Sequence, residues 1–299
     1  MVAPDLVIRS RRVVSERGTR AAAIHVKHGK IVGVLDFEDV PPGCPLDDAG
    51  DAAVLPGVVD IQVDASADAD AVMRTAAAGG VTTIVDASAC ATRIVPAQDE
   101  AVPSLLDAGR PFRTPTHILN LSSSDALAPL FHARAARLPI SAGTCPHYLY
   151  FAAEELPGLG ARFRCTPPIP GRADRELLCA AIAHGLLQAV SSGGLTPMEL
   201  SLSATWTVAH GRGCTLDQLA HWMCRAPAQV AGLTRKGRVD VGYDADLVVF
   251  WSDTEFTVNR LGKDRHALPY AGRRLRGVVS RTYLRGVCSV FTRNTSRHC

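Results

Sequence analysis

The stretch VLPGVVDIQVD, residues 54–64, is an apolar run that is interrupted once by Pro-Gly and then carries a polar residue at every second position. Because successive side chains of a strand point to opposite faces, Asp60, Gln62 and Asp64 would share one face while the apolar residues between them pack on the other. This pattern predicts a barrel strand that presents ligands at its mouth. The alternative is a buried strand whose end reaches solvent, because short apolar runs are common.

The composition is typical of a soluble globular protein. Of the 299 residues, 47% are hydrophobic and 20% are charged, and the net charge is +3 with a pI near 8.4. A nucleic-acid binder carries a stronger basic excess on one face. No window approaches the run of about eighteen apolar residues that a membrane span needs, and the N-terminus lacks a signal-peptide pattern. We therefore expect no nucleic-acid or membrane partner and a cytoplasmic location.

Two residue types bear on metal chemistry. The nine cysteines are spaced irregularly and contain no CxxC pair, which predicts reduced thiols and no thiolate zinc site. The four lysines are Lys27, Lys30, Lys236 and Lys263, so residues 56–235 contain none. No site in that region can use a lysine.

Strand patterns occupy both ends of the chain, and strands alternate with helices between them. The predicted strands are residues 5–10, 11–16, 22–29, 30–37, 81–88, 116–121, 163–166, 186–192, 238–242, 245–252, 255–259, 275–286 and 287–293. The predicted helices are residues 69–78, 125–136, 175–186, 198–210 and 216–233, and residues 138–151 form a further strand-helix unit. Thr215 and Gln218 form a capping box at the start of the last helix, and Pro227 should bend or restart it. Residues 91–114 are predicted to be irregular.

This order predicts an α/β fold in two parts. The strands of residues 1–55 and 236–292 would pair into one composite β-sandwich domain, and residues 56–235 would form an incomplete, TIM-barrel-like (β/α) domain. Residues 57–232 number 176 (232 − 57 + 1), whereas an eightfold barrel typically needs about 250 residues. The barrel-like part is therefore expected to be truncated and open.

Several sequence blocks resemble the amidohydrolase superfamily in family order. They are VLPGVVD, AAAGGVTTIVDAS, HILNLSSSDAL, TCPHYLYFAAEELP, RCTPPI, APAQVAGL, RKGRVDVGYDADLVVF and PYAGRRLRGVVSRTYLRG, preceded by DLVIRSRRVV and AAIHVKHGKIVGV. Within the superfamily the chain is similar to the cyclic amidases, namely allantoinase, dihydropyrimidinase or hydantoinase, and dihydroorotase. The blocks HILNLSSSDAL, TCPHY and PYAGRRLRGVV look most like allantoinase.

The resemblance implies a metallo-dependent hydrolase fold with two zinc ions bridged by a carboxylated lysine. Such metals lower the pKa of bound water and polarise the attacked carbonyl. At the family's ligand positions this chain carries Gln62, Asp64, Asn120 and Ser192, and only Asp64 could still bind a hard cation. The bridging lysine has no counterpart, and about three barrel strands are missing between residues 88 and 116. We therefore predict no catalytic residue, no cofactor and no confident metal ligand.

The family reaction would be hydrolysis of (S)-allantoin to allantoate in purine catabolism. We expect this chain to be impaired or inactive in it. One alternative is a non-catalytic protein that associates with an intact paralogue, or with itself, through exposed strand edges. Another is a damaged gene product without function.

Other catalytic patterns are weaker. Cys145 and His147 could form a thiol-imidazole pair, but their counterparts in the family are not nucleophiles. Residues 122–124 are three serines without the GxSxG elbow, and AAAGGVTT lacks both the Walker lysine and the GxGxxG pattern. The remaining histidines of the predicted helices have no partner histidine at helical spacing; they are His132, His184, His210 and His221.

Overall fold

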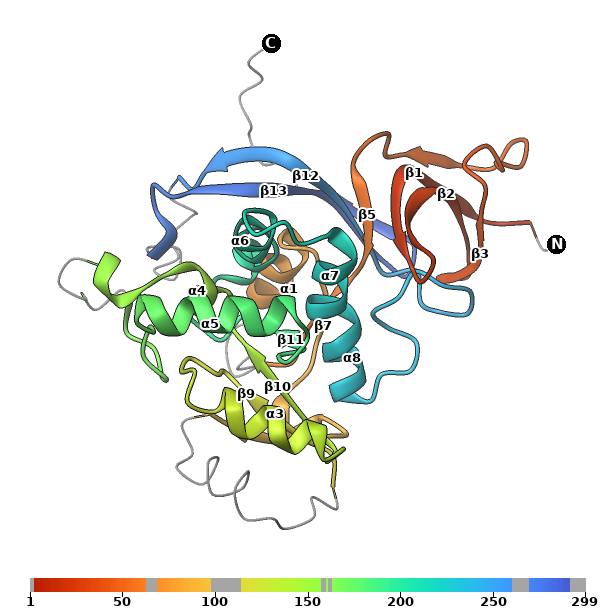
Figure 1. The fold of residues 1–299 in the computed structure, drawn as a ribbon. Helices are drawn as coiled ribbons and strands as arrows, with labels where there is room; N and C mark the ends of the chain where they lie inside the picture. Colours follow the sequence, from red (N-terminus) through yellow and green to blue (C-terminus); the bar gives the residue numbers. More distant parts are fainter. Residues whose placement is uncertain are drawn as a thin grey trace.

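The computed structural model describes residues 3–62, 69–97, 114–156, 160, 163–259 and 269–290. Figure 1 shows a sheet built from both chain ends above a middle of alternating strands and helices. Asp64, the one residual ligand that the sequence suggests, lies outside the described residues. Within the described part, no helix is both long and apolar enough to cross a membrane.

The two ends of the chain form one eight-stranded sheet in the order β14-β13-β12-β5-β1-β2-β3, with β4 paired to β1. Its strands are β1 (Leu6–Ser15), β2 (Gly18–Lys27), β3 (Lys30–Leu35), β4 (Leu46–Asp48), β5 (Ala53–Pro56), β12 (Leu247–Thr257), β13 (Arg274–Leu284) and β14 (Val287–Val290). The ends meet where β5 pairs antiparallel with β12, so that Leu247 lies opposite Pro56. The division into residues 1–55 with 236–292 and residues 56–235 as separate domains stays a prediction.

The predicted strands of this sheet are confirmed in place and corrected in detail. Residues 5–10 and 11–16 form the single strand β1, whose register with β2 shifts between Ser10 and Val13. The Ser10 hydroxyl accepts from the Arg12 backbone N–H at 2.8 Å and donates to Ala52 O at 2.6 Å, which satisfies the backbone where the strand bulges. The strands predicted at 245–252 and 255–259 likewise join as β12, and residues 238–242 form turns instead of a strand.

The middle of the chain alternates strands with helices. Its elements are β6 (Val58–Asp60), α1 (Ala69–Ala78), β7 (Val81–Ile84), η1 (Ala87–Ala89), β8 (Arg93–Pro96), β9 (Thr116–Leu119), α3 (Leu127–Ala135), β10 (Ile140–Thr144), α4 (Pro146–Tyr150), η2 (Ala153–Glu155), α5 (Arg172–Ala183), β11 (Ala189–Val190), α6 (Met198–His210), α7 (Leu216–Ala220), the π-helix η4 (His221–Arg225) and α8 (Ala226–Ala231). Strands β8, β9, β10 and β11 form one parallel sheet, and β6 and β7 form another. Among the described residues no strand pairing joins β7 to β8, so these strands do not close into a barrel.

The predictions made from the capping box and from Pro227 in the middle of the chain are confirmed. The capping box of Thr215 and Gln218 opens α7, and the helix passes through a π-helical segment before restarting as α8 around Pro227. Two predictions were wrong: residues 93–96 form the strand β8 within a segment predicted to be irregular, and residues 163–166 form no strand. Residues 93–96 become a strand because they pair with β9, whereas residues 163–166 pair with no described strand, so their local sequence preference is not enough.

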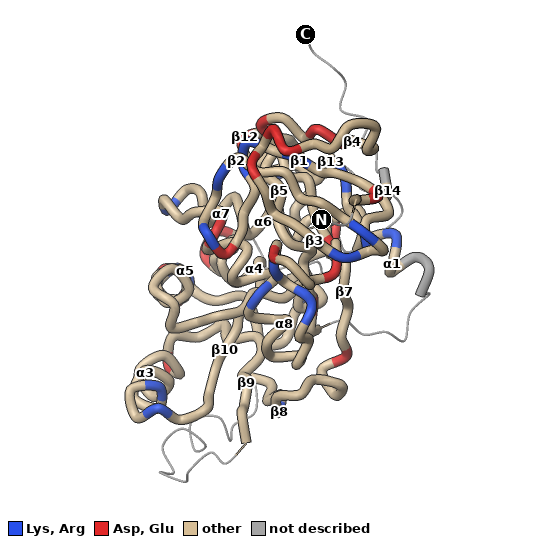
Figure 2. Tube along the Cα trace, turned by 90° about the vertical axis from the view of Figure 1, so that its right-hand side faces the viewer, with Lys and Arg blue, Asp and Glu red and all other residues tan. Residues whose placement is uncertain are grey.

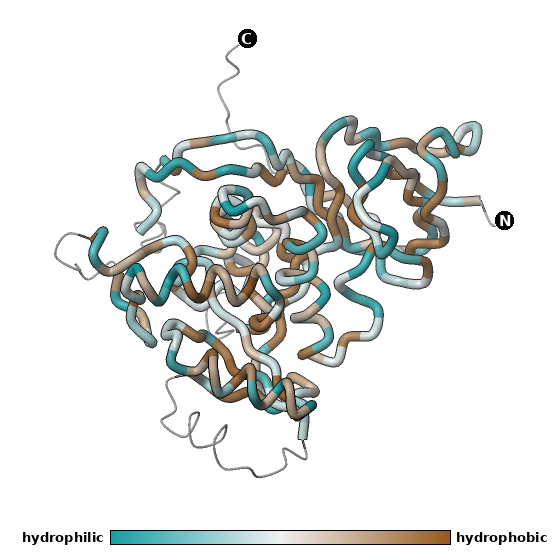
Figure 3. The backbone as a smooth tube through the Cα atoms, viewed as in Figure 1, coloured by the Kyte–Doolittle hydropathy of each residue, from teal (hydrophilic) through white to brown (hydrophobic). Residues whose placement is uncertain are grey.

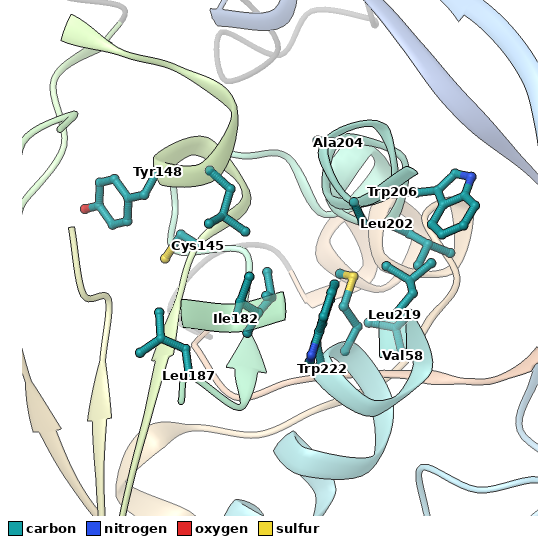
Figure 4. Close-up of a cluster of buried hydrophobic side chains, with 14 of the residues drawn as sticks. Val58, Cys145, Tyr148, Ile182, Leu187, Leu202, Ala204, Trp206, Leu219 and Trp222 are labelled. Carbon is teal, nitrogen blue, oxygen red and sulfur yellow. The ribbon is translucent and has the colours of Figure 1, made fainter. Parts of the chain in front are cut away.

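The main hydrophobic core lies between the large sheet and the middle (Figure 3). Figure 4 shows Val58 of β6, Leu202 and Trp206 of α6, and Trp222 of η4 converging there from three different elements. Trp206 on α6 also donates its indole N–H to Ser252 O of β12 at 2.8 Å. This bond fixes α6 beneath the sheet, and so holds the strand ends of the middle against a rigid support.

Candidate functional site

Four strand ends of the middle converge on one buried carboxyl group. Asp60 is the last residue of β6, and only 2% of its surface is exposed. One carboxyl oxygen of Asp60 accepts from the Gln62 backbone N–H at 3.0 Å, and the other accepts from the Ser192 backbone N–H at 3.1 Å. The end of β6 is thereby tied to the segment that follows β11.

The ends of β9 and β10 reach the same place through a thiol. Cys145 follows β10, and its Sγ donates to Asn120 Oδ1 at 3.0 Å and lies 3.9 Å from Gln62 Oε1. Asn120 follows β9 and has a left-handed backbone with φ of 65°, a conformation that asparagine tolerates better than most residues. The cluster of Asp60, Gln62, Asn120, Cys145 and Ser192 is called the strand-end cluster below.

The strand-end cluster brings together three of the four residues that the resemblance predicts at the family's ligand positions. Gln62, Asn120 and Ser192 come from three separate strands, and the structure links them through Asp60 and Cys145. The sequence predicts Asp60 only as part of a strand face, and Cys145 only as a member of a disfavoured thiol-imidazole pair. Neither central role carries a sequence signal, because each depends on contacts between residues far apart in the chain.

The donor atoms of this cluster do not fit a pair of divalent metals. Both carboxyl oxygens of Asp60 already accept backbone N–H groups, and the amides of Gln62 and Asn120 are poor replacements for imidazole. Among the described residues there is no group of three or more His, Cys, Asp or Glu that could hold a metal ion. The ligands that a binuclear zinc site needs are therefore not assembled by this part of the chain.

Burial also sets the protonation states of the cluster against metal binding. Desolvation raises the pKa of the Asp60 carboxyl, although its hydrogen bonds from Ser192 and Gln62 oppose the shift. Burial raises the pKa of the Cys145 thiol well above its ordinary value, and the nearby Asp60 adds to the effect. Since a cysteine binds metal as the thiolate, Cys145 is held in the form that does not coordinate.

Cys145 and His147 do not form a catalytic pair. The hydrogen bonds of Cys145 go to the strand-end cluster, whereas His147 Nδ1 lies 3.1 Å from Thr196 Oγ1. Gly193 passes between them, because a Cβ atom there would lie 2.3 Å from Cys145 Sγ and 3.0 Å from His147 Cε1. Burial lowers the pKa of His147 to about 3, so the ring is neutral and the thiolate-imidazolium form is disfavoured.

A second network of hydrogen-bonded side chains, which the sequence does not predict, contains His147, Thr196 and Tyr270. Thr196 Oγ1 bridges His147 Nδ1 and the hydroxyl of Tyr270 at 2.9 Å, and all three side chains are buried. His147 Nε2 has no hydrogen-bond partner among the described residues. The same holds for His117 Nε2, whose Nδ1 lies 2.7 Å from Ser141 Oγ. These histidines pack inside the protein and reach neither each other nor Asp60 through any hydrogen bond.

The remaining candidates have structural roles. The Ser124 hydroxyl donates to Asp174 Oδ1 at 2.6 Å and so connects the start of α3 to that of α5. His221 lies half-buried in the π-helix, where burial lowers its pKa. The rings of His132, His184 and His210 lie on helices or at their ends, away from the strand-end cluster.

Comparisons with known proteins agree with this architecture. Residues 180–286 match the family described as the amidohydrolase family. The chain is 29% identical to the allantoinase of Streptomyces avermitilis over 94% of each protein, and 36% identical to the allantoinase of Arabidopsis thaliana over 57% of this chain and 39% of that protein. Its fold is similar to that of the dihydropyrimidinase from Brevibacillus agri NCHU1002, with a TM-score of 0.79 and 17% identity over 95% of this chain and 94% of the other.

The lengths in these comparisons show how much of the relative has no counterpart in this chain. The alignment with the Streptomyces avermitilis protein runs over 420 positions, so at least 121 of them (420 − 299) hold no residue of this chain. The structural match nevertheless extends over nearly all of both chains. The predicted α/β fold with a truncated, TIM-barrel-like middle is confirmed.

Proposed function

Since the chain belongs to the amidohydrolase superfamily as an allantoinase-like member, we propose that it keeps the fold of a cyclic amidohydrolase and does not hydrolyse allantoin. The observation that carries the proposal is the strand-end cluster. The family positions there hold amide and hydroxyl groups, and the buried Asp60 is saturated by backbone donors. Hydroxide attack on a ring amide needs a metal or a strong general base to generate the nucleophile, and this cluster offers neither.

The lysine distribution supports the same proposal independently of any alignment. A carboxylated lysine that bridges two metals must come from the barrel, and residues 56–235 contain no lysine. Lys236 is the first lysine after this region, and it forms ion pairs with Asp244 and Asp246 in the loop that leads into β12. It is therefore committed to structure and cannot supply the bridge.

Metal analysis and an allantoin assay test the proposal together. The purified full-length chain, loaded with excess zinc and then desalted, should retain substoichiometric zinc and should release no allantoate above the buffer rate. The allantoinase of Streptomyces avermitilis, handled in parallel, serves as the positive control. Stoichiometric zinc accompanied by allantoin hydrolysis would overturn the proposal.

A second function is a non-catalytic association with an intact paralogue or with another copy of the chain. The observation that favours it is the break between the two parallel sheets of the middle. Among the described residues, β7 and β8 each pair with a strand on one side only. Free strand edges promote association with other chains. Size-exclusion chromatography with light scattering distinguishes a discrete complex from the aggregation that a damaged product without function would show.

A further inference from the structure

A groove runs along β7 between α1 and the end of the large sheet. It has a volume of about 500 Å³, and it is lined by all four residues of β7 together with Met73 and Arg74 of α1 and Thr282, Leu284 and Ser289 of β13 and β14. Figure 2 shows α1, β7 and β14 on the same side of the molecule. The groove lies apart from the strand-end cluster, and none of the cluster's residues lines it.

The backbone of β7 is open toward this groove. In the described part of the chain β7 pairs with β6 alone, in a two-stranded parallel sheet. Thr83 lines the groove, and its Oγ1 is buried without a hydrogen-bond partner among the described residues. An edge strand of this kind presents unpaired N–H and C=O groups that an extended segment can bind.

Large apolar side chains are exposed beside this edge. Met73 on α1 is 56% exposed, and Leu284 and Val287, which lie opposite each other in β13 and β14, are 44% and 71% exposed. Exposed apolar residues that stand singly are normal, but a group that borders a groove is typical of an interaction site. A segment that binds here would cover apolar surface as well as form backbone hydrogen bonds.

The charge of the groove selects the partner. No Asp or Glu lines it, and its basic residues are Arg74 and Lys236. Lys236 is neutralised by Asp244 and Asp246, whereas Arg74 is exposed and forms no ion pair with a described residue. In a symmetric pairing of two copies through β7, the two Arg74 side chains would be brought toward each other, which disfavours a second copy. An acidic segment is favoured instead.

We propose that this groove binds an extended peptide segment of a partner protein that adds as a strand to the free edge of β7. The segment alternates apolar residues, which cover Met73 and Leu284, with polar ones, and it carries a carboxylate that meets Arg74. This binding does not depend on whether the chain hydrolyses allantoin, and its readout is separate from zinc content and turnover.

Binding of the amidated peptide EVTVTVE, labelled at its N-terminus with an uncharged fluorophore, to the full chain tests the proposal when it is followed by fluorescence anisotropy at low salt. Saturable binding is expected. The peptide KVTVTVK should bind at least about tenfold more weakly, and the variant Arg74→Glu should reverse this preference. Arg17→Glu, which makes the same charge change in the exposed turn between β1 and β2, should leave both affinities unchanged.

A version of EVTVTVE with N-methyl groups separates strand addition from simple apolar contact. For both edges of the peptide to be blocked, every peptide nitrogen carries the methyl group, because successive N–H groups of a strand point to opposite edges. This peptide keeps every side chain but cannot form the backbone ladder, so its binding should be lost. The proposal is overturned if EVTVTVE fails to saturate, if the N-methylated peptide binds equally well, or if Arg74→Glu has no more effect than Arg17→Glu. Thermal unfolding of each variant confirms that it is folded.

Discussion

The large sheet and the strand ends of the middle differ in the partners that they give to carboxyl groups. At the large sheet and in the loop that leads into β12, carboxylates meet cations: Lys236 pairs with the buried Asp244 and Asp246, and Arg281 pairs with the partly buried Asp47. In the strand-end cluster the buried Asp60 meets only neutral groups. The buried carboxylates beside the sheet are thus paired with a cation, whereas Asp60 is held by a network of hydrogen bonds from neutral groups.

The difference follows from what each region requires. A sheet can absorb an irregularity in one strand by a local shift of register, and the bulge at Ser10 in the interior strand β1 shows such an adjustment. A closed barrel depends on the number, tilt and shear of all its strands together, so the loss of some strands opens the rest. The loss of strands therefore affects the middle much more than the sheet.

The largest expected effect is at Lys236, in the loop that leads into β12 of the large sheet. Replacing it in Lys236→Met leaves Asp244 and Asp246 buried without their cation, which should lower the free energy of unfolding by about 3–5 kcal/mol. Urea unfolding followed by circular dichroism measures the change. Lys30→Met, which removes an exposed lysine from β3, is the matched control, and equal losses in both variants would contradict the role given to the buried pairs.

Acid should weaken the middle through its buried histidines. Burial lowers the pKa of His117 to about 4, whereas a histidine in the unfolded chain titrates near its ordinary value of about 6.5. The unfolded chain therefore binds the proton first, so the free energy of unfolding falls as the pH drops from about 6.5 to about 4. The loss is on the order of 3 kcal/mol for this residue.

Urea unfolding between pH 4 and pH 7 measures this loss. His117→Gln should make the profile less steep, leaving the part that comes from the buried His147, and His28→Gln, which changes an exposed ring, should leave it unchanged. A wild-type profile that is level across this range would show that His117 does not titrate as its burial requires.

Asp60 should respond to pH in the opposite direction. Its folded pKa is raised above 3.8, so its contribution to stability is present below that value and is lost as the pH rises through the folded pKa. Asp60→Asn replaces the protonated carboxyl group by a neutral amide of the same shape, which likewise has one good acceptor oxygen, so the variant should lose less than about 1 kcal/mol at low pH. Because the variant has no carboxyl group to ionise, the wild type should lose stability relative to it as the pH rises. A constant difference would mean that Asp60 does not titrate in this range.

The sequence predicts most elements of this protein but not the contacts at its strand ends. Helix α6 and the capping box of Thr215 follow from local patterns, which act within a few residues. The strand β8 was missed because its stability comes from pairing with β9, on the far side of the segment that separates them in the chain. Gln62, Asn120 and Ser192 were found by resemblance, yet the links through Asp60 and Cys145 depend on folded geometry that no local pattern encodes.

The smallest expected effect is also the sharpest test of the difference between the regions, and it concerns Gln62. This side chain is half-buried, and its described contact is the 3.9 Å approach of Cys145 Sγ to its amide oxygen. Gln62→Ala should therefore change the free energy of unfolding by less than about 0.5 kcal/mol, as is usual for a substitution that removes no buried network. EDTA should add nothing in either protein, because a chelator destabilises a chain only where a metal contributes to folding. A loss of several kcal/mol in Gln62→Ala or on addition of EDTA would contradict this expectation. It would show that a bound metal, and not the hydrogen bonds around Asp60 alone, holds the strand ends together.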